Sequence, residues 1–340
     1  MSMFNPSKSL FLVMMILGTM ISISSNSWPA TWMGLEINLL AFIPLISSKD
    51  NMLSTEAAMK YFIIQAMASS MLLTFVILNS IMNMNIMNEN ATNSIISITL
   101  FLKMGAAPFH MWFPSVMEGL SWLNCFILMT WQKLAPFVIL SYLSYYQPIM
   151  IFVMLSSILI GSIGGLNQTS LRKIMTYSSI NHIGWMLLGL MMSENLWQFY
   201  FIIYIILSMT ILLIFFNLSS QHSNQIPLSW NSSTIKFFIS VNLMSLGGLP
   251  PFLGFLPKWM IIQNSCYNNM EFLVLIMILF TLLTLFYYLR LMMSSFLINV
   301  NQLKWNHQSI QKLNNPYLIS LLTSISLFTL PLYPIMFFSI

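Results

Sequence analysis

Four ionisable side chains lie within apolar runs that are long enough to cross a bilayer. They are one carboxylate and three ammonium groups: Glu36, Lys103, Lys133 and Lys258. Each such charge costs about 2.5–3.5 kcal/mol at the middle of a membrane helix, so it usually faces a bundle interior or a water-filled cavity. An ion pair that only fixes helix packing is the alternative, but one carboxylate cannot neutralise three lysines. The residue types therefore predict a pathway for protons or ions.

Prolines interrupt two of the apolar runs beside these lysines. The segments PFHMWFPS (108–115) and PFLGFLPK (251–258) both read Pro-Phe, two residues, an aromatic residue, one residue, Pro, and glycines precede each. Proline frees a backbone carbonyl one turn earlier, and a membrane tolerates such a group only where protein or water satisfies it. We expect helix breaks, with hydrated pockets beside Lys103 and Lys258, at Pro108, Pro114, Pro250, Pro251 and Pro257.

Two histidines form a second group of candidates. His110 follows Pro108 within the first expected break, and His182 lies midway along another apolar run. Either imidazole could relay protons, because an unperturbed imidazole titrates near neutral pH. Either could equally be an interior side chain that is hydrogen-bonded and has no part in proton transfer.

No motif for a redox cofactor, nucleotide or metal is present in the sequence. Cys125 and Cys266 are isolated, so they cannot ligate an iron–sulfur cluster by themselves. The chain has no GxGxxG or Walker-type loop that could hold a dinucleotide or ATP. We therefore expect no cofactor and no metal in this chain.

The elements that position these residues are expected to be membrane helices. Charged residues make up 6% of the chain, against about 25% in soluble domains. Hydrophobic residues make up 58%, and the short alternating segments of a β-barrel are absent. The sequence predicts an all-α polytopic membrane protein of about eleven transmembrane helices. The expected spans are 9–25, 27–47, 57–81, 92–117, 119–144, 147–167, 174–192, 196–218, 234–264, 270–297 and 317–338.

The charges of the loops predict the orientation of these spans. One side of the membrane receives Lys8, Lys49, Lys60, Arg172, Lys173, Lys236, Lys304 and Lys312, and Arg290 could reach it by snorkelling. The other side receives no Lys or Arg. The positive-inside rule then places the N-terminus inside and the C-terminus outside. The net charge of +5 is explained by topology, so no nucleic-acid partner is expected.

The two proline-rich segments also predict an internal repeat. They fall in the fourth and ninth spans, and an offset of five means that the two copies cross the membrane in opposite directions. Inverted repeats with discontinuous helices carry their ion sites near the bilayer midplane. We expect a single membrane domain, 1–340, made of a first repeat at 9–144, a second repeat at 147–297 and a lateral C-terminal helix at 317–338.

Three long segments resemble a known family. They are LFLKMGAAPFHMWFPSVMEG (100–119), GGLNQTSLRKIMTYSSINHIGWM (164–186) and SLGGLPPFLGFLPKW (245–259). All three are similar to the antiporter-like membrane subunits of respiratory complex I, the mitochondrial NADH–ubiquinone oxidoreductase. The resemblance runs from about residue 5 to the C-terminus. The many Met, Asn, Ile and Phe residues resemble those of animal, and especially insect, mitochondrial proteins.

The resemblance implies a proton-translocating subunit and assigns roles to the buried charges. The family's carboxylate on the second helix of the first repeat matches Glu36, and its lysine on the first broken helix matches Lys103. The bridging lysine of the following helix matches Lys133, and the lysine of the second broken helix matches Lys258. Animal members lack three N-terminal helices of their bacterial relatives, which fits the expected eleven spans.

The resemblance also implies where the redox chemistry takes place. NAD, FMN, iron–sulfur clusters and ubiquinone are expected in partner subunits. The expected partners are antiporter-like chain 4, small membrane chain 4L and lipids such as cardiolipin, in the mitochondrial inner membrane. The N-terminus is expected in the matrix and the C-terminus in the intermembrane space. A freestanding cation/proton antiporter of the same fold and a purely structural scaffold remain as alternatives.

Overall fold

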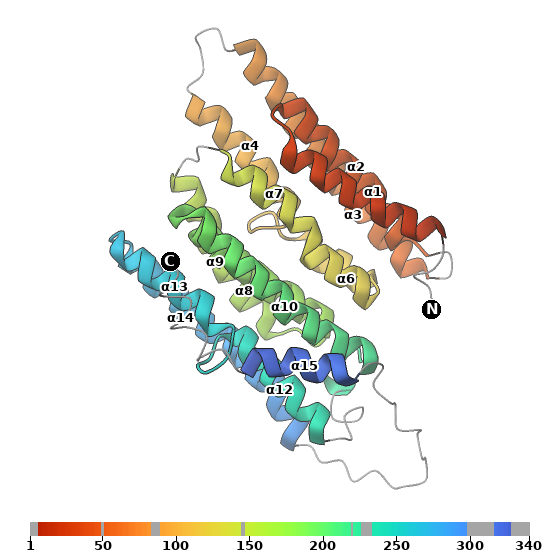
Figure 1. Ribbon diagram of the computed structural model, residues 1–340, viewed down its shortest axis with the longest axis vertical. Coiled ribbons are helices and arrows are strands. Elements are labelled where there is room, and N and C mark those ends of the chain that lie inside the picture. Colours follow the sequence, from red (N-terminus) through yellow and green to blue (C-terminus); the bar gives the residue numbers. More distant parts are fainter. Residues whose placement is uncertain are drawn as a thin grey trace. The chain divides into compact units, whose positions relative to one another are not determined.

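The computed structural model describes residues 6–48, 51–82, 89–143, 147–218, 220–225, 233–297 and 316–327. Within these ranges the regular elements are helices, so the expected all-helical class is confirmed there (Figure 1). The chain forms two compact units, unit 1 (Met1–Ser157) and unit 2 (Ile158–Ile340). Lys49, Lys304 and Lys312 lie outside the described residues, as does the second half of the expected helix 317–338.

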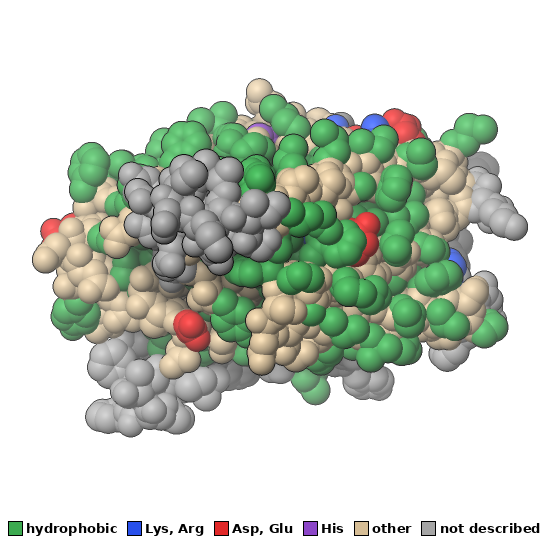
Figure 2. Space-filling model, turned by 90° about the horizontal axis from the view of Figure 1, so that it is seen from above, with side chains coloured by type: hydrophobic (Ala, Val, Ile, Leu, Met, Phe, Trp, Pro, Cys, Tyr) green, Lys and Arg blue, Asp and Glu red, His purple; other side chains and the backbone are tan. Residues whose placement is uncertain are grey.

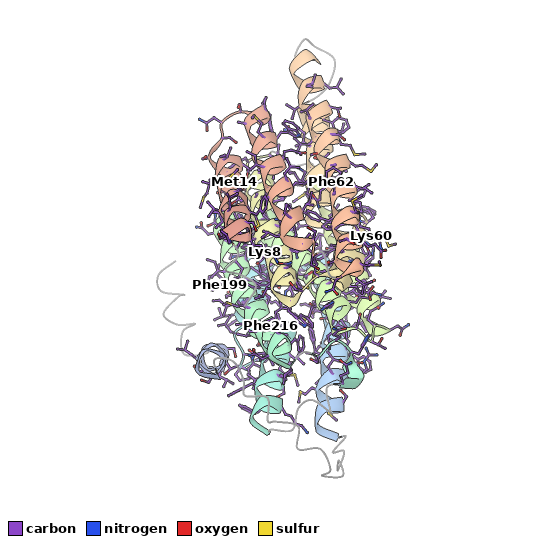
Figure 3. The ribbon with its side chains drawn as sticks, turned by 90° about the vertical axis from the view of Figure 1, so that its right-hand side faces the viewer. Lys8, Met14, Lys60, Phe62, Phe199 and Phe216 are labelled. Carbon is purple, nitrogen blue, oxygen red and sulfur yellow. The ribbon has the colours of Figure 1, made fainter. Side chains whose placement is uncertain are left out.

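Unit 1 is a bundle of helices from the first half of the chain. Its elements are α1 (Pro6–Ser24), α2 (Trp28–Ile46), α3 (Met52–Met82), α4 (Glu89–Met104), α5 (Trp112–Gly119), α6 (Trp122–Met129), α7 (Trp131–Ser141) and the first part of α8 (Gln147–Leu166). α2 packs against α1 and α3, while α4 packs against α3 and α7. Lys8 of α1 and Lys60 of α3 lie toward the same end of this bundle (Figure 3).

Unit 2 contains the rest of α8 and the helices that follow. They are α9 (Leu171–Met192), α10 (Glu194–Leu218), the short 3-10 helix η2 (Ser223–Gln225), α12 (Ser233–Gly247), α13 (Phe255–Tyr267), α14 (Glu271–Leu297) and α15 (Pro316–Leu327). α9 packs against α10 and α13, α12 packs against α14, and α15 packs against α10 and α12.

Among the described residues, seven helical segments are long and apolar enough to cross a membrane. They are Pro6–Ser24, Trp28–Ile46, Met52–Leu78, Trp122–Ser141, Gln147–Leu166, Glu194–Leu218 and Glu271–Ser294. Hydrophobic side chains cover much of the face shown in Figure 2, as expected for a surface that contacts lipid tails. Three other expected spans correspond to α9, which is more polar, and to the divided pairs α4–α5 and α12–α13.

The chain leaves the helical conformation after α4, in a segment that we call break 1 (residues 105–111). Gly105 has a φ of 73°, which is favourable only for glycine. Its N–H donates to Leu102 O at 3.2 Å, and the N–H of Ala106 donates to Phe101 O at 3.0 Å. These two bonds form a Schellman motif, which ends α4 at Met104.

The segment after α12, break 2 (residues 248–254), begins in the same way. Gly248 has a φ of 78°. Its N–H donates to Ser245 O at 3.0 Å, and the N–H of Leu249 donates to Met244 O at 3.3 Å. The two breaks therefore share one local mechanism, in which a left-handed glycine closes the preceding helix.

The prolines do not all lie in the breaks. Pro108 lies in break 1, and Pro250 and Pro251 lie in break 2. Pro114 and Pro257 are instead the third residues of α5 and α13. The positions of Pro114 and Pro257 inside helices differ from the predicted breaks. A helix accommodates proline in its first turn because the N–H that proline lacks would have no helical partner there.

The expected span 119–144 is present as the segment Trp122–Ser141, which is interrupted at one residue, Thr130. Its Oγ1 donates to Phe126 O at 2.7 Å, and its backbone N–H donates to the same oxygen at 3.0 Å. A hydroxyl that bonds the preceding turn competes with the regular helical pattern and bends the helix. The division separates α6 from α7 and was not predicted.

Candidate functional site

Lys103 lies in the last turn of α4, two residues before the glycine that starts break 1. It is 7% exposed and borders a cavity. About 20 Å³ of this cavity is open to the centre of a water molecule, which is enough to hold one water. The cavity is formed by Leu35, Asn38, Leu39, Tyr61, Gln65, Lys103, Gln132 and Pro136.

Uncharged polar residues make up half of the residues that line this cavity: Asn38, Tyr61, Gln65 and Gln132. Gln132 Nε2 donates to Asn38 Oδ1 at 3.0 Å, and Tyr61 Oη donates to Gln132 Oε1 at 3.4 Å. Gln65 Nε2 donates to the backbone oxygen of Lys103 at 3.2 Å. These side chains leave donors and acceptors that a water can use. Sequence analysis missed all four of these polar residues, although their positions inside apolar helices were a usable signal.

Glu36 lies on α2 next to the face that borders the cavity. One of its carboxylate oxygens, Oε2, is buried and has no hydrogen-bond partner among the described residues. Glu36 lies within electrostatic range of Lys103, although no ion pair joins the two in the part of the chain that the structure describes. A buried carboxylate oxygen without a hydrogen-bond partner is costly, so this position suits a bound water.

Lys133 occupies the interior of α7. It is 1% exposed, and its Nζ lies 5.2 Å from the centroid of the Phe113 ring of α5. The face of an aromatic ring attracts a cation, so the Phe113 ring is a suitable neighbour for the ammonium. Lys133 follows Gln132, whose amide borders the cavity of Lys103.

The carbonyls released at break 1 are bonded by neutral donors. Trp112 Nε1 donates to Leu102 O at 3.2 Å, and Ser156 Oγ of α8 donates to Ala107 O at 2.9 Å. The side-chain amide of Gln65 donates to the backbone carbonyl of Lys103. The ammonium of Lys103 is therefore not needed to satisfy the break. His110 is buried, with its Nδ1 3.2 Å from the oxygen of Pro108.

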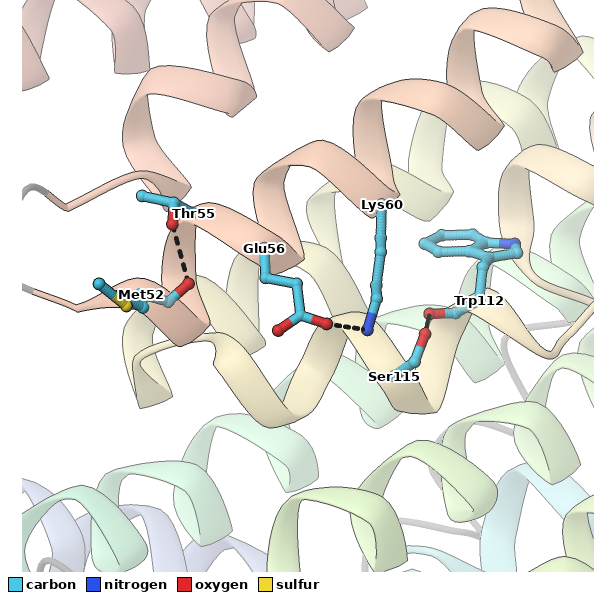
Figure 4. A network of polar contacts seen from close by, with 6 residues as sticks. All are labelled: Met52, Thr55, Glu56, Lys60, Trp112 and Ser115. Carbon is cyan, nitrogen blue, oxygen red and sulfur yellow. Dashed lines mark hydrogen bonds and ion pairs between the residues drawn. The ribbon is translucent and has the colours of Figure 1, made fainter.

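An exposed ion pair in unit 1 contrasts with these buried charges. Lys60 Nζ lies 2.6 Å from Glu56 Oε1, one turn earlier on α3, and both side chains are exposed. Figure 4 shows this pair beside Ser115 of α5, whose hydroxyl donates to the oxygen of Trp112. A pair of this kind stabilises a helix by only about 0.3–0.5 kcal/mol. We treat it as a surface feature that can serve as a control.

Lys258 of unit 2 bridges break 2. It is the fourth residue of α13, it is 6% exposed, and its Nζ donates to the oxygen of Gly247 at 2.8 Å. The ammonium also lies 6.0 Å from the ring centroid of Trp185 on α9. In contrast to Lys103, this lysine itself bonds a carbonyl at the end of the interrupted helix.

His182 of α9 is buried in unit 2. Its Nδ1 lies 2.8 Å from Tyr200 Oη of α10, and its ring lies 5.0 Å from the ring of Tyr204. Glu36, Lys103, Lys133 and His110 thus belong to unit 1, and His182 and Lys258 belong to unit 2.

The described residues contain no group of three His, Cys, Asp or Glu side chains that could hold a metal. Cys125 is buried and Cys266 is exposed, and neither forms a disulfide.

Comparison with known proteins decides the family. Residues 25–284 match the family described as NADH:quinone oxidoreductase/Mrp antiporter, TM. NADH-ubiquinone oxidoreductase chain 2 of Anopheles gambiae is 54% identical over 303 residues, which cover 88% of this chain and 89% of that protein. The chain belongs to the NADH-ubiquinone oxidoreductase chain 2 family. The resemblance found in the three sequence segments is confirmed.

One further relative supports this family, and one solved structure shares the fold. NADH-ubiquinone oxidoreductase chain 2 of Aedes aegypti is 51% identical over 328 residues, covering 94% of this chain and 95% of that protein. A chain of respiratory complex I from Thermus thermophilus, solved with bound aureothin, superposes with a TM-score of 0.81. It is 20% identical, and the match covers 97% of this chain and 80% of that chain. This last likeness concerns the fold alone.

Proposed function

We propose that this family member is a proton-translocating subunit in the membrane arm of respiratory complex I. Family membership supports its place in an NADH:ubiquinone oxidoreductase, and the buried charges support proton transfer within the chain. NADH oxidation and quinone reduction would take place in partner subunits that hold NAD, FMN, iron–sulfur clusters and ubiquinone. The chain would move protons through water and side chains.

The proposed relay consists of Glu36, Lys103, Lys133 and Lys258, with His110 and His182 in a supporting role. The cavity beside Lys103 is the observation that carries this proposal, because a buried ammonium borders a water-sized space there. Glu36 lies on α2, the helix whose Leu35, Asn38 and Leu39 line the same cavity. Glu36 and Lys103 carry opposite charges and lie within electrostatic range of each other. A change in the charge of Glu36 would therefore alter how readily Lys103 releases its proton.

A double-mutant cycle in the assembled complex tests the relay. We expect Lys103→Met and Glu36→Gln each to impair proton translocation, measured as protons moved per NADH oxidised and as turnover. Because both act on one step, the double variant should be much less damaging than the product of the two single effects.

Lys60→Met is the matched control, since it removes an exposed ammonium from the same unit. Its proton yield should stay normal. A normal yield and turnover in assembled Lys103→Met complex would contradict the proposed relay. Strictly multiplicative losses would show that Glu36 and Lys103 act independently.

The same function implies a repeat architecture, a membrane orientation and neighbouring subunits for this chain. Two five-helix repeats, 9–144 and 147–297, would cross the membrane in opposite directions among eleven spans, with α15 as a lateral helix. The shared glycine geometry of the two breaks supports this symmetry. The chain would lie in the mitochondrial inner membrane with its N-terminus in the matrix and its C-terminus in the intermembrane space. Chain 4, chain 4L and cardiolipin would be its neighbours.

A further inference from the structure

The two units place an asparagine in the same kind of helix contact. Along the chain, the left-handed glycines of break 1 and break 2 are separated by the same number of residues as Gly18 and Gly161, and as Asn38 and Asn181. A Cβ on Gly18 of α1 would lie 2.8 Å from the backbone nitrogen of Asn38 on α2. A Cβ on Gly161 of α8 would lie 2.7 Å from the backbone nitrogen of Asn181 on α9. Asn181 is therefore the counterpart in unit 2 of Asn38 in unit 1.

Asn38 lines the cavity beside Lys103, which has room for a water. Its Oδ1 accepts a hydrogen bond from Gln132 Nε2 of α7 at 3.0 Å. Asn181 also reaches another helix of its own unit, since its Nδ2 donates to Thr284 Oγ1 of α14 at 3.5 Å. This equivalence predicts a water site beside Asn181 as well.

The side chain of Asn181 has a buried atom that needs a partner. Asn181 is 2% exposed, and its Oδ1 has no hydrogen-bond partner among the described residues. Exchanging the two amide atoms would leave the nitrogen unpaired instead, because the hydroxyl of Thr284 already donates to Thr281 O at 2.7 Å. One turn later on the same face of α9, Trp185 is 1% exposed, and its Nε1 likewise has no partner in the described part of the chain. A buried acceptor and a buried donor thus lie one turn apart.

The neighbouring polar side chains of α9 are bonded within the protein. They pair as His182 with Tyr200, Ser178 with Tyr288 and Ser179 with Tyr204. These bonds join α9 to α10 and α14, which gives the tyrosine hydroxyls a structural role. Native proteins pair nearly all buried polar atoms, so the unpaired atoms of Asn181 and Trp185 call for a bound molecule that both donates and accepts.

Lys258 lies at the same place. Its Nζ is 6.0 Å from the ring centroid of Trp185, and only one of its three N–H donors is used by the bond to Gly247 O. We infer that Asn181 and Trp185 hold a buried water beside Lys258. The indole N–H donates to this water, and the water donates to Asn181 Oδ1. A lone pair of the water oxygen is left to receive the proton of Lys258.

The transfer from Lys258 to this water needs no oxidant or reductant. An N–H bond of the ammonium breaks, its electron pair stays on the nitrogen, and a new O–H bond forms on the water. Trp185 and Asn181 are positioning residues in this step, because they orient the water and carry no proton themselves. This inference rests on the proposed function and names the group with which Lys258 exchanges its proton.

A structure of the assembled complex that shows ordered waters tests the site directly. We expect an ordered water within about 3.2 Å of both Asn181 Oδ1 and Trp185 Nε1. A side chain, another subunit or a lipid bonded directly to either atom would overturn the inference, as would the lack of an ordered water between them.

Two variants test whether Lys258 uses this water. Trp185→Phe removes the N–H and keeps an aromatic ring beside the ammonium, while Asn181→Leu removes the amide at similar volume. We expect each variant to lower NADH-driven proton translocation per assembled complex about 10-fold, which corresponds to about 1.4 kcal/mol in the barrier. The solvent isotope effect on turnover should rise, because proton transfer then limits the rate. A merely structural role would leave that isotope effect unchanged.

The two substitutions should not add up, because both remove the same water. The double variant should be no slower than the slower single variant. Strictly multiplicative losses would show two separate roles and overturn the water site. Trp259→Phe is the control, since this tryptophan of α13 is 36% exposed, and it should leave rate and isotope effect unchanged.

Lys258→Met separates this inference from the proposed function. If Lys258→Met impairs translocation while Trp185→Phe and Asn181→Leu have a normal rate and isotope effect, the water site is wrong and the relay stands. If all three variants are normal, the proposed function fails and this role of the water fails with it. Should the substituted chains not assemble, the ordered water in the unsubstituted complex decides, and its absence overturns the inference.

Discussion

The three buried lysines differ in what surrounds their ammonium groups. Lys103 faces a water-sized cavity, Lys133 lies over an aromatic ring and Lys258 bonds a backbone carbonyl. The same substitution should therefore have different structural consequences at the three positions. At Lys258 it should also loosen the junction between α12 and α13, because it removes the bond to Gly247.

Gly248 should be indispensable for the position of Lys258. A Cβ at Gly248 would lie 2.8 Å from Lys258 Nζ, and its φ of 78° is unfavourable for alanine by about 1–2 kcal/mol. We expect Gly248→Ala to lower the thermal stability of the complex and its turnover together. Gly247→Ala is the control, since its Cβ would meet its nearest neighbour at 3.6 Å. Equal stability and turnover in the two variants would contradict this reading of break 2.

The sequence revealed the charged residues of the site more readily than the uncharged ones. A charge in an apolar run is costly, so Glu36 and Lys103 stood out without any structure. Asn38, Gln65 and Gln132 cost less to bury when they are hydrogen-bonded, and asparagine is common throughout this chain. Their role depends on which helices face each other, and that is set by tertiary packing.

At the scale of helices, the two breaks follow from short sequence signals. Glycine permits the left-handed residue that ends α4 and α12, and the prolines that follow cannot continue a helix. The division at Thr130 had no such signal, because a threonine inside a helix only sometimes bonds the preceding turn. Helix ends that depend on backbone geometry were thus predictable, whereas this side-chain competition was not.

Ser156 should stabilise break 1 from α8. Its hydroxyl donates to Ala107 O, and that carbonyl is buried, so removing the donor should cost about 1 kcal/mol or more. We expect Ser156→Ala to lower the thermal inactivation midpoint of the complex. The control is Ser157→Ala on the same helix, because its hydroxyl donates only to Met154 O of its own helix among the described residues. If both variants shift the midpoint equally, the contact with break 1 does not matter.

At the scale of the whole molecule, the distribution of charge sets the expected topology. In unit 2 the carboxylates Glu194 and Glu271 begin α10 and α14, while Arg172 and Lys173 lie in the first turn of α9. A helix the length of α9 rises about 33 Å at 1.5 Å per residue, enough to cross the hydrocarbon core. α9 is therefore expected to separate two aqueous sides despite its polar character.

Cysteine labelling tests that expectation. A cysteine at Gln168, before α9, should react only from the matrix, and one at Ser193, after α9, only from the intermembrane space. The exposed native Cys266 must first be replaced by serine so that it does not contribute signal. Labelling of both sites from one side would show that α9 does not cross the membrane, and the inverted repeat would fail with it.

The bond from Lys258 to Gly247 has a mechanical consequence. A charged donor forms a hydrogen bond roughly twice as strong as a neutral one. Deprotonation of Lys258 would therefore weaken the hydrogen bond that joins the end of α12 to the start of α13. The rigidity of break 2 would then depend on the charge of Lys258. Loss of the proton from Lys258 would make the junction between α12 and α13 more flexible.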